Sequence, residues 1–331
     1  MFAHPFHYKY VVISYGYEYY DYVYRDYQNC SYAKYFNEIR FPHFLESLYH
    51  RHISLPLNTV LFRDRWTKVY VHYIDKQIKT FVKDGEIVCF LLLAGGKNNQ
   101  LLRYGLTEHL RRKYSRCKIV YFINDLVAKT NQPIELIKSK ADLVISFDPG
   151  DAMKYNVLYH VIPYSKNTFC KSTVEYDIAF VGAAKDRLHT LLDIHKYLIS
   201  NGVNSHFHII NAPEKDQEQL PGVVYSGFIT YEENLSVLSK SRCIIEIVQK
   251  GSCGNTIRVG EAIMLRKKIL TNNPRIAING VYDSTNMRIF SNCKDIDIDF
   301  IKEKIEVKYS IADLMYPDNL LLFIEKNIID E

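Results

Sequence analysis

The stretch that decides the fold is Cys243–Asn273, CIIEIVQKGSCGNTIRVGEAIMLRKKILTNN. An apolar run opens it, a polar loop with glycine follows over residues 249–255, and the pattern then predicts a helix over Thr256–Arg266 and a second strand over Lys268–Thr271. Strand, loop, helix and strand in this order form one unit of a doubly wound α/β sheet, in which ligands bind outside the strand ends. The stretch therefore predicts a parallel sheet with a ligand site at its loop.

The start of this predicted helix suits a phosphate. Asn255 and Thr256 can both cap the first amide groups of the helix, where the helix dipole favours an anion. Arg258 adds a forked, permanently charged donor. Glu261 lies three residues further on about the same face, and its carboxylate could accept hydrogen bonds from two ribose hydroxyls. The set predicts a nucleoside-diphosphate site. The alternative is a capped helix with a surface ion pair that contributes little.

Length and composition bound the class of protein. A chain of 331 residues is long enough for two domains. Its longest apolar run, Ile87–Ala94, is far shorter than the roughly 18 residues of a membrane span. No basic segment followed by an apolar core marks a secretory signal. The seven cysteines are scattered without a CxxC pair, which argues against disulfide frameworks and zinc sites. We expect a cytoplasmic location.

Positive charge is concentrated in the first half. The net charge is +5, and residues 1–170 contain 23 Lys and Arg against 15 Asp and Glu, whereas the remainder contains 19 against 22. A basic half suits an anionic partner such as a phosphorylated lipid, a membrane surface or a nucleic acid. The alternative is that its lysines merely keep the outer faces of helices solvated. No nucleic-acid-binding module is recognisable. We therefore expect no nucleic acid partner, and a contact with the inner face of a membrane.

Four apolar strands are expected in the first half, each followed by a polar loop with Gly, Asp or Asn: Tyr10–Ser14, Ile87–Ala94, Lys118–Ile123 and Asp142–Phe147. The segment Gly95–Asn99 is expected to be a loop free to approach a ligand, without the spacing of a phosphate-binding P-loop. A helix is expected over Gln100–Tyr114.

Tyrosine is crowded at the start of the chain, with eleven within the first 35 positions. Tyr17, Tyr20, Tyr24 and Tyr27 recur at spacings of three and four residues, which predicts a helix with an aromatic stripe. Such a stripe most often packs in a core, and the alternative is a surface that stacks on sugars or bases.

A second alternating series begins at residue 176. The strand Tyr176–Gly182 turns on glycine, a helix follows over Leu188–Asn201, and Val223–Phe228 predicts a further strand. Thr230 and Glu233 have the spacing of a capping box at the start of the next helix. The tail from Ile301 to Glu331 is expected to be mainly helical.

Residues 176–292 resemble the nucleotide-sugar-binding domain of GT-B glycosyltransferases, in particular bacterial enzymes of lipopolysaccharide and capsular polysaccharide assembly. Three segments carry the resemblance: YDIAFVG, VVYSGFITYEENLSVLSKSRCIIEI and GNTIRVGEAIMLRKKILT. The last contains the family pattern G-x-T-x-R-x-x-E-A. Many members have two glutamates eight positions apart here, and in this chain Glu261 is matched while the earlier position is Cys253.

The resemblance implies a fold of two Rossmann-like doubly wound α/β domains facing a cleft. It implies an acceptor-side domain over residues 1–165, a nucleotide-sugar domain over 166–300 and a helical tail over 301–331, packing back on the first domain. It also implies that a basic residue contacts the diphosphate, that a strand lies beside the base and that a glutamate holds the ribose. The donor-binding residues implied are Gly182, Arg187, Tyr225, Gly227, Phe228, Gly254, Asn255, Thr256, Arg258 and Glu261.

The chemistry implied needs no bound metal and no cofactor. Arg258 and Lys185 are expected to neutralise the departing diphosphate. Asp125, just after a predicted strand, is the candidate carboxylate for an acceptor hydroxyl, although capping of a turn is its alternative role. Asp148 and Asp151 form the nearest approach to an acidic metal motif and are interpreted as a turn. His206 and His208 lie in a predicted strand and are expected to be structural.

The function expected from these residues and this resemblance is sugar transfer from a nucleoside-diphosphate sugar to a glycan or lipid-linked acceptor, with retention at the anomeric carbon. Two alternatives remain. One is a nucleotide-sugar epimerase of the same architecture, and the other is a nucleotide-sugar-binding protein without turnover. A dehydrogenase is disfavoured because no GxGxxG follows a strand.

Overall fold

The computed structural model describes residues 6–54, 60–166, 172–249 and 251–328. The chain divides into two compact units. Unit 1 comprises Met1–His160 with Pro317–Glu331, and unit 2 comprises Val161–Tyr316. Within the described residues each unit is built on a six-stranded parallel sheet. The predicted α/β class with two doubly wound sheets is therefore confirmed.

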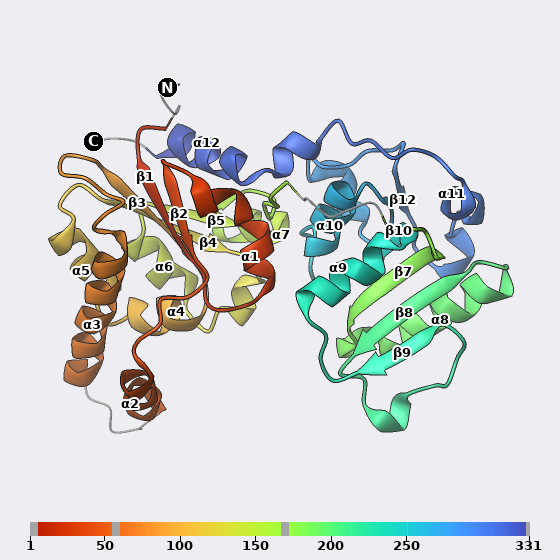
Figure 1. Ribbon diagram of the computed structural model, residues 1–331, viewed down its shortest axis with the longest axis horizontal. Helices are drawn as coiled ribbons and strands as arrows, with labels where there is room; N and C mark the ends of the chain where they lie inside the picture. The colour runs from red at the N-terminus through yellow and green to blue at the C-terminus, as the bar shows by residue number, and fades with distance from the viewer. Residues whose placement is uncertain (1–5, 55–59, 167–171, 250, 329–331) are drawn as a thin grey trace. The chain divides into compact units, whose positions relative to one another are not determined.

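The sheet of unit 1 has the strand order β2-β1-β3-β4-β5-β6 (Figure 1). Its strands are β1 (Lys9–Ile13), β2 (Ala33–Phe36), β3 (Val88–Leu93), β4 (Lys118–Ile123), β5 (Leu143–Ser146) and β6 (Leu158–Tyr159). The chain order reverses between β1 and β3, so the switch point of this sheet lies at the carboxyl ends of those two strands. The short strand β2 was not predicted from the sequence.

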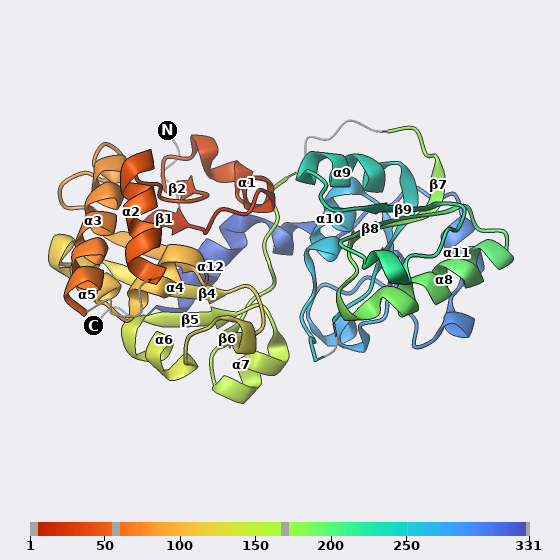
Figure 2. The ribbon, with the colours of Figure 1, turned by 90° about the horizontal axis from the view of Figure 1, so that it is seen from below.

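One face of this sheet carries helices that bury apolar side chains against β1, β3 and β4. They are α2 (His43–Ser54), α3 (Val60–Ile78), α4 (Gly96–Leu102), α5 (Leu106–Lys113) and α6 (Ile134–Lys140) (Figure 2). The helix α12 (Pro317–Asn327) belongs to the same unit, and the Tyr10 hydroxyl on β1 donates to the Glu325 carboxylate at 3.0 Å. The carboxyl-terminal segment is thus bound to the first strand.

The predicted aromatic stripe is mostly core. It forms α1 (Tyr19–Val23) and a 3-10 turn over Arg25–Asn29, rather than one helix. Tyr20, Tyr24 and Tyr27 are buried, which confirms core packing for these three. Tyr17 precedes α1 and is 58% exposed.

Gly95 and Gly96 are not a flexible loop, because α4 begins at Gly96 and Lys97 is buried. A Cβ on Gly95 would lie 2.6 Å from the ring of Tyr15, and one on Gly96 would lie 2.7 Å from the Tyr15 Cβ. The two glycines are required so that Tyr15 can pack over the end of β3. The prediction of a loop over Gly95–Asn99 is therefore wrong. The two glycines on which it rested leave room for the packing of Tyr15.

One other prediction is wrong. The expected helix Gln100–Tyr114 is interrupted, because α4 ends at Leu102 and α5 begins after Gly105, whose φ is 83°. The tail from Ile301 is mainly helical over its described residues, as expected, although residues 303–311 lie outside helices.

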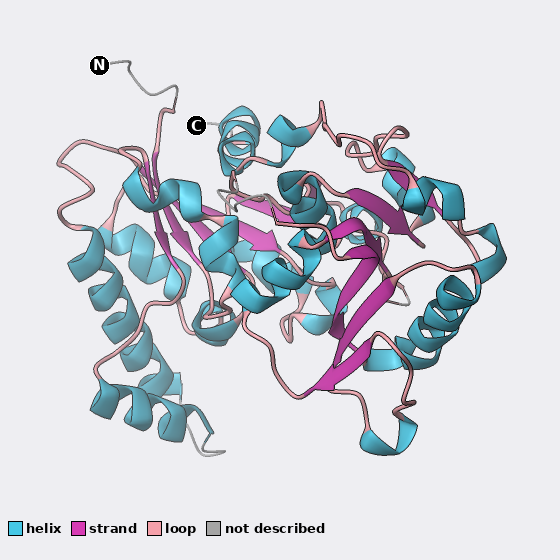
Figure 3. Ribbon diagram, turned by 45° about the vertical axis from the view of Figure 1, so that its right-hand side comes forward, coloured by secondary structure: helices cyan, strands magenta, loops and turns pink. Residues whose placement is uncertain are grey.

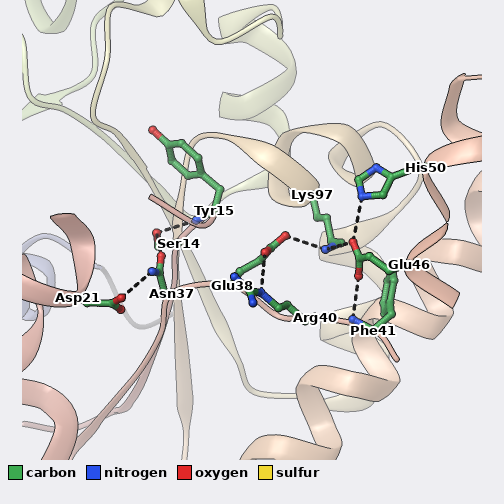
Figure 4. A network of polar contacts seen from close by, with 10 residues as sticks. All are labelled: Ser14, Tyr15, Asp21, Asn37, Glu38, Arg40, Phe41, Glu46, His50 and Lys97. Carbon is green, nitrogen blue, oxygen red and sulfur yellow. Dashed lines mark hydrogen bonds and ion pairs between the residues drawn. The ribbon is translucent and has the colours of Figure 1, made fainter. Parts of the chain in front are cut away.

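A buried ion cluster links α4 to α2 and to the loop after β2 (Figure 4). The Lys97 ammonium lies 2.8 Å from the Glu38 carboxylate and 2.7 Å from the Glu46 carboxylate, and its side chain is 4% exposed. It also lies 5.1 Å from the ring centroid of Phe41. A buried ammonium needs such partners, because an unpaired buried charge is costly.

The sheet of unit 2 has the order β12-β11-β10-β7-β8-β9. Figure 3 distinguishes the strands, in magenta, from the helices, in cyan. Its strands are β7 (Tyr176–Ala183), β8 (Ser205–Ile210), β9 (Val223–Ser226), β10 (Ser241–Glu246), β11 (Lys268–Thr271) and β12 (Met287–Ile289). This is the doubly wound order of dinucleotide-binding domains, and its switch point lies between β7 and β10. Helices α8 (Leu188–Ser200) and α11 (Ile298–Lys302) contribute to one core layer.

Two further helices lead back to the central strands of unit 2. Helix α9 (Tyr231–Ser239) begins with the predicted capping box of Thr230 and Glu233. Helix α10 (Ile257–Leu265) begins at its N-cap Thr256 and connects β10 to β11. The helix at the centre of the sequence prediction is therefore confirmed to within one residue at each end.

The Lys97 cluster yields a pH-dependent prediction. Burial raises the pKa of Glu46, but hydrogen bonds from Lys97 and the Phe41 amide, together with the Lys97 charge, outweigh it and lower the pKa. A lowered folded-state pKa stabilises the fold above the unfolded pKa, and this stabilisation is lost as the pH falls through the folded pKa. Glu46→Gln should lower the free energy of unfolding at neutral pH by about 1–3 kcal/mol.

Urea unfolding of wild type and variant should show this difference shrinking from about pH 6 to about pH 3. The matched control is Glu135→Gln, because Glu135 is exposed and 3.6 Å from Lys138. A difference for Glu46→Gln that stays constant across this pH range would contradict the assignment.

Candidate functional site

The candidate site lies at the switch point of unit 2, where β7 ends in Gly182-Ala183 and β10 ends in Glu246. Parallel strands bring their carboxyl ends to one edge, and the reversal of strand order opens a crevice there. The loop after β7 carries Arg187, and the loop after β10 leads to Arg258. The topology therefore places two arginines at one edge of the sheet.

Arg187 is held across the switch point. Its guanidinium donates to the Ile247 carbonyl beyond β10 and, at 3.2 Å, to the Ala183 carbonyl at the end of β7. It also lies 5.4 Å from the ring centroid of Phe180. A Cβ on Gly182 would lie 3.2 Å from Phe180 and 3.6 Å from Arg187, so glycine keeps this space open.

The two arginines interact unfavourably. Burial and then the positive charge of Arg258 lower the pKa of Arg187 to about 10, while the Asp186 and Glu246 carboxylates act in the opposite direction. Two like charges in a poorly solvated position create a positive potential that a bound anion would relieve. The site is therefore suited to a ligand with more than one negative charge.

Glu246, which the sequence analysis did not select, organises this edge. It is fully buried, and its Oε1 accepts from the Thr256 amide at 2.9 Å and the Thr256 hydroxyl at 2.7 Å. Its Oε2 accepts from the Thr271 hydroxyl at 2.6 Å. Burial raises its pKa, although these hydrogen bonds and the Arg187 charge work against the rise. The sequence feature that could have identified Glu246 is its position as a carboxylate inside the otherwise apolar run CIIEIV.

Thr256 is the N-cap of α10, as predicted, and its hydroxyl accepts from the Arg258 amide at 3.2 Å. The Thr256 amide itself donates to Glu246. Two amides at the helix start therefore have acceptors within the protein. Most of the attraction for an anion must come from the side-chain cations rather than from those amides.

Arg258 and Glu261 form a buried pair. The Arg258 guanidinium donates to Glu261 Oε2, and the side chains are 17% and 0% exposed. Glu261 Oε1 accepts from the Tyr231 hydroxyl at 2.7 Å and from the Asn234 amide at 3.1 Å. The alternative of a surface ion pair is therefore wrong. The contact of Glu261 with a ribose stays a prediction.

The loop before α10 is fixed by asparagines that follow β11. Asn273 Nδ2 lies 3.3 Å from the carbonyl of Gly254, and Asn279 Nδ2 donates to the Cys253 carbonyl at 2.9 Å and to Asn255 Oδ1 at 3.1 Å. Asn255 is buried, and in the described part of the chain its Nδ2 has no acceptor. Residues 253–255 of this loop are thus held by hydrogen bonds within the protein.

Three of the other donor-site predictions lie further from the two arginines along the sheet. Tyr225 lies in β9, two strands from β7, and its hydroxyl donates to the Glu218 carbonyl at 2.9 Å. Gly227 has open space around its Cα, and Phe228 is 74% exposed. Lys185, in contrast, lies on the turn before Arg187, is exposed and has a φ of 47°. The predicted residues that the structure brings to the switch point are Gly182, Arg187, Thr256, Arg258 and Glu261, and the residues in and after β9 lie apart from them.

The carboxylates of unit 1 differ in their roles. Asp125 follows β4, is 53% exposed at its side chain and lies 3.6 Å from Lys129. Asp148 caps α7 (Pro149–Tyr155) by accepting from the Gly150 and Asp151 amides, and Asp151 accepts from the Val127 amide at 2.7 Å. The interpretation of Asp148 and Asp151 as a structural turn is confirmed. Asp125 remains the accessible carboxylate of this group.

Within the described residues, no group of three or more His, Cys, Asp or Glu side chains is arranged to hold a metal ion. His206 and His208 both lie in β8, and the His208 ring is 2.8 Å from the Ser226 hydroxyl. None of the helices in the described ranges combines the length and apolar character needed to cross a bilayer.

A cavity of about 890 Å³ in unit 2 lies at the other end of α10. It is lined by Leu265, Arg266 and the segment 305–309, and by none of the predicted site residues. The size of this cavity does not by itself indicate a function. The switch point is the better candidate site, because it combines two arginines with loop residues held by hydrogen bonds.

Protein-family models give no match to the chain. Curated protein sequences give none either. Among solved structures it is similar to Anabaena Alr3699/HepE in complex with UDP and glucose, with a TM-score of 0.53 and 11% identity over 97% of this chain and 98% of that chain. An α-glucosyltransferase in complex with UDP and a 13-mer DNA has a TM-score of 0.49 and 11% identity over 96% and 90%. The likeness to the Anabaena protein confirms the predicted GT-B fold.

Glu246 yields a prediction with two substitutions. Glu246→Gln keeps an acceptor for Thr256 and should retain the fold, whereas Glu246→Leu leaves the Thr256 amide and hydroxyl without one. Urea unfolding at neutral pH should place the Leu variant at least ~2 kcal/mol below the Gln variant. Equal stability of the two variants would contradict this role.

The pH dependence has the opposite sign to that of Glu46. Because the folded-state pKa of Glu246 is raised, the stability of wild type relative to Glu246→Gln should fall as the pH rises through the interval between the ordinary and the raised pKa.

Proposed function

We propose that this protein is a glycosyltransferase that moves a sugar from a nucleoside-diphosphate sugar to a glycan or lipid-linked acceptor. The observation that carries the proposal is the pair Arg187 and Arg258 at the β7/β10 switch point, where burial and then the charge of Arg258 lower the pKa of Arg187. A diphosphate supplies negative charge for both guanidiniums, in place of Glu261 as the partner of Arg258. The binding of UDP and glucose by the structurally similar Anabaena protein supports the same class of donor.

We propose that, when the donor binds, Arg258 exchanges its partner Glu261 for the diphosphate. Without donor, Arg258 neutralises Glu261 Oε2, while Tyr231 and Asn234 hold Glu261 Oε1. When the diphosphate takes the guanidinium, Oε2 becomes available to the ribose hydroxyls and Oε1 keeps its position. The carboxylate thus stays oriented by neutral donors during the exchange.

In the reaction, the acceptor oxygen forms a bond to the anomeric carbon while the bond from that carbon to the β-phosphate oxygen breaks. The diphosphate leaves with the electron pair, and Arg187, Arg258 and Lys185 stabilise its charge. The acceptor hydroxyl proton passes to the Asp125 carboxylate. Protein cations perform the role of a metal. We propose retention at the anomeric carbon, which requires the acceptor oxygen to approach the same face of the sugar from which the diphosphate departs.

The acceptor side is assigned to surface polysaccharide assembly at the inner face of a membrane. Exposed apolar side chains on α2 (Phe44 and Leu48) and on α3 (Phe62) support a peripheral contact of unit 1 with lipid. Arg51 on α2 is also exposed and suits an anionic headgroup.

The donor site is tested with Arg187→Gln and Arg258→Gln. A glutamine at position 258 can still donate to Glu261, so the fold should persist. Both variants should lose about 10²–10³ in kcat/KM for the donor, because a cation facing the leaving group is absent. They should also lose the thermal stabilisation that the best ligand among UDP-, GDP-, CMP- and dTDP-linked sugars gives to wild type.

The matched control is Arg242→Gln, which removes a guanidinium paired with Asp177 at 3.3 Å near the amino end of β10. Donor stabilisation retained in Arg187→Gln and Arg258→Gln would refute the site. Donor conversion without any acceptor would indicate an epimerase, and donor binding without turnover in an acceptor screen would indicate a binding protein.

Asp125→Asn tests the acceptor side. The variant should keep the donor-induced thermal shift, since Asp125 belongs to the other unit, but lose at least about 10²-fold in kcat of transfer. The control is Glu135→Gln, another exposed carboxylate of unit 1. Unchanged transfer by Asp125→Asn would remove this residue from the mechanism.

A further inference from the structure

The loop after β1 presents an aromatic ring that the core does not use. Tyr17 is 58% exposed, whereas Tyr20, Tyr24 and Tyr27 of the same stripe are 1% exposed. Its ring is stacked on Tyr19, with centroids 6.0 Å apart and an interplanar angle of 21°. An exposed tyrosine supported by a second ring offers a broad apolar surface at a small cost in side-chain entropy.

This ring lies beside polar groups that follow β4. The Tyr15 ring contacts Tyr17 at 5.3 Å between centroids, and the Tyr15 hydroxyl is 3.4 Å from Asn124 Oδ1. Asp125 directly follows Asn124 in the chain, and its side chain is 53% exposed. Residues from β1 and β4 are thus brought together at one edge of the sheet.

Asn124 carries a donor without an acceptor. Its side chain is 9% exposed, and in the described ranges its Nδ2 has no hydrogen-bond partner. A buried amide group left without an acceptor destabilises the fold. A ligand that supplies a hydrogen-bond acceptor to Asn124 Nδ2, or water in its place, would account for this unpaired donor.

The loop that carries Tyr17 is held in place (Figure 4). The Tyr15 amide donates to the Ser14 hydroxyl at 2.6 Å, and the Gly16 amide donates to the Asn37 carbonyl at 3.0 Å. Gly16 has a φ of +98°, and a Cβ there would lie 3.5 Å from the Glu38 carboxylate of the Lys97 cluster. Binding to this surface therefore requires little ordering of the loop.

We propose that Tyr17, Asn124 and Asp125 form a carbohydrate-binding platform for a sugar ring of the acceptor. The platform rests on the proposed function, and it deepens it by assigning the chemistry of the acceptor. The apolar C–H face of a pyranose stacks on Tyr17, while its hydroxyls accept from Asn124 Nδ2 and donate to the Asp125 carboxylate.

The charges around the platform are mixed. The side chain of Asp125 is 53% exposed and lies 3.6 Å from Lys129, Glu18 is exposed, and the Asp21 carboxylate binds Asn37 in the same region. A nucleic acid is therefore tested as the alternative ligand, because its binding depends on neutralisation by Lys and Arg, whereas a neutral sugar needs none.

Direct saccharide binding tests the platform without the donor. Wild-type protein is titrated with the methyl glycosides of glucose, galactose, mannose and N-acetylglucosamine, and saturation-transfer NMR detects the contact. At least one glycoside should bind. Its dissociation constant should rise about tenfold in Tyr17→Ala and in Asn124→Ala, and remain within about threefold of wild type in Tyr17→Phe, which keeps the ring.

The matched control is Phe44→Ala, which removes another exposed aromatic ring of unit 1, 64% exposed on α2. The same variants are tested for stabilisation by UDP, so that failure of the donor site is seen separately. Absence of glycoside binding by wild type, equal binding by Tyr17→Ala, or binding of a single-stranded oligonucleotide in place of the glycosides would each overturn the platform.

Discussion

The carboxylate of Glu246, buried at the end of β10, is the constraint on which the donor-side geometry depends. It accepts from the amide and hydroxyl of Thr256 and from the hydroxyl of Thr271. These bonds connect the ends of β10 and β11 to the start of α10, and so determine where Arg258 emerges. A buried carboxylate without them would be too costly to keep ionised.

The same carboxylate also balances charge. Its negative charge opposes the effects of burial and of Arg258 on the pKa of Arg187, and Glu261 neutralises Arg258. Two cations therefore lie at one sheet edge: Arg258 is paired with Glu261, and Arg187 donates to the carbonyls of Ile247 and Ala183. Under the proposed function, a diphosphate would replace Glu261 as the partner of Arg258.

In unit 1, too, contacts between distant segments fix the end of the sheet at the switch point. At its switch point Tyr15 packs on Gly95 and Gly96, and the buried Lys97 ties the adjoining helices together. Among the groups of this region that remain accessible are Tyr17 and Asp125, with Lys129 3.6 Å from the Asp125 carboxylate.

The sequence by itself determined the strand series, the cap at Thr256 and the close spacing of Arg258 and Glu261, because strand periodicity, capping and i, i+3 neighbours are local properties. It could not show that the Arg258–Glu261 pair is buried, because burial depends on Tyr231 and Asn234 from another helix. The structural likeness confirmed the GT-B fold, but assignment of individual residues to donor and acceptor remains a proposal.

Only the tertiary structure decided the remaining features. Glu246 reads as an interruption of an apolar run until Thr256 and Thr271 are brought to it. Gly95 and Gly96 suggested a ligand loop until Tyr15, about eighty residues earlier in the sequence, was found to fill their space. Tyr17 could not be told from its buried neighbours, because equal spacing along the chain does not specify which ring the core covers. Local patterns fix elements, whereas contacts between distant segments fix which side chains are left to bind a ligand.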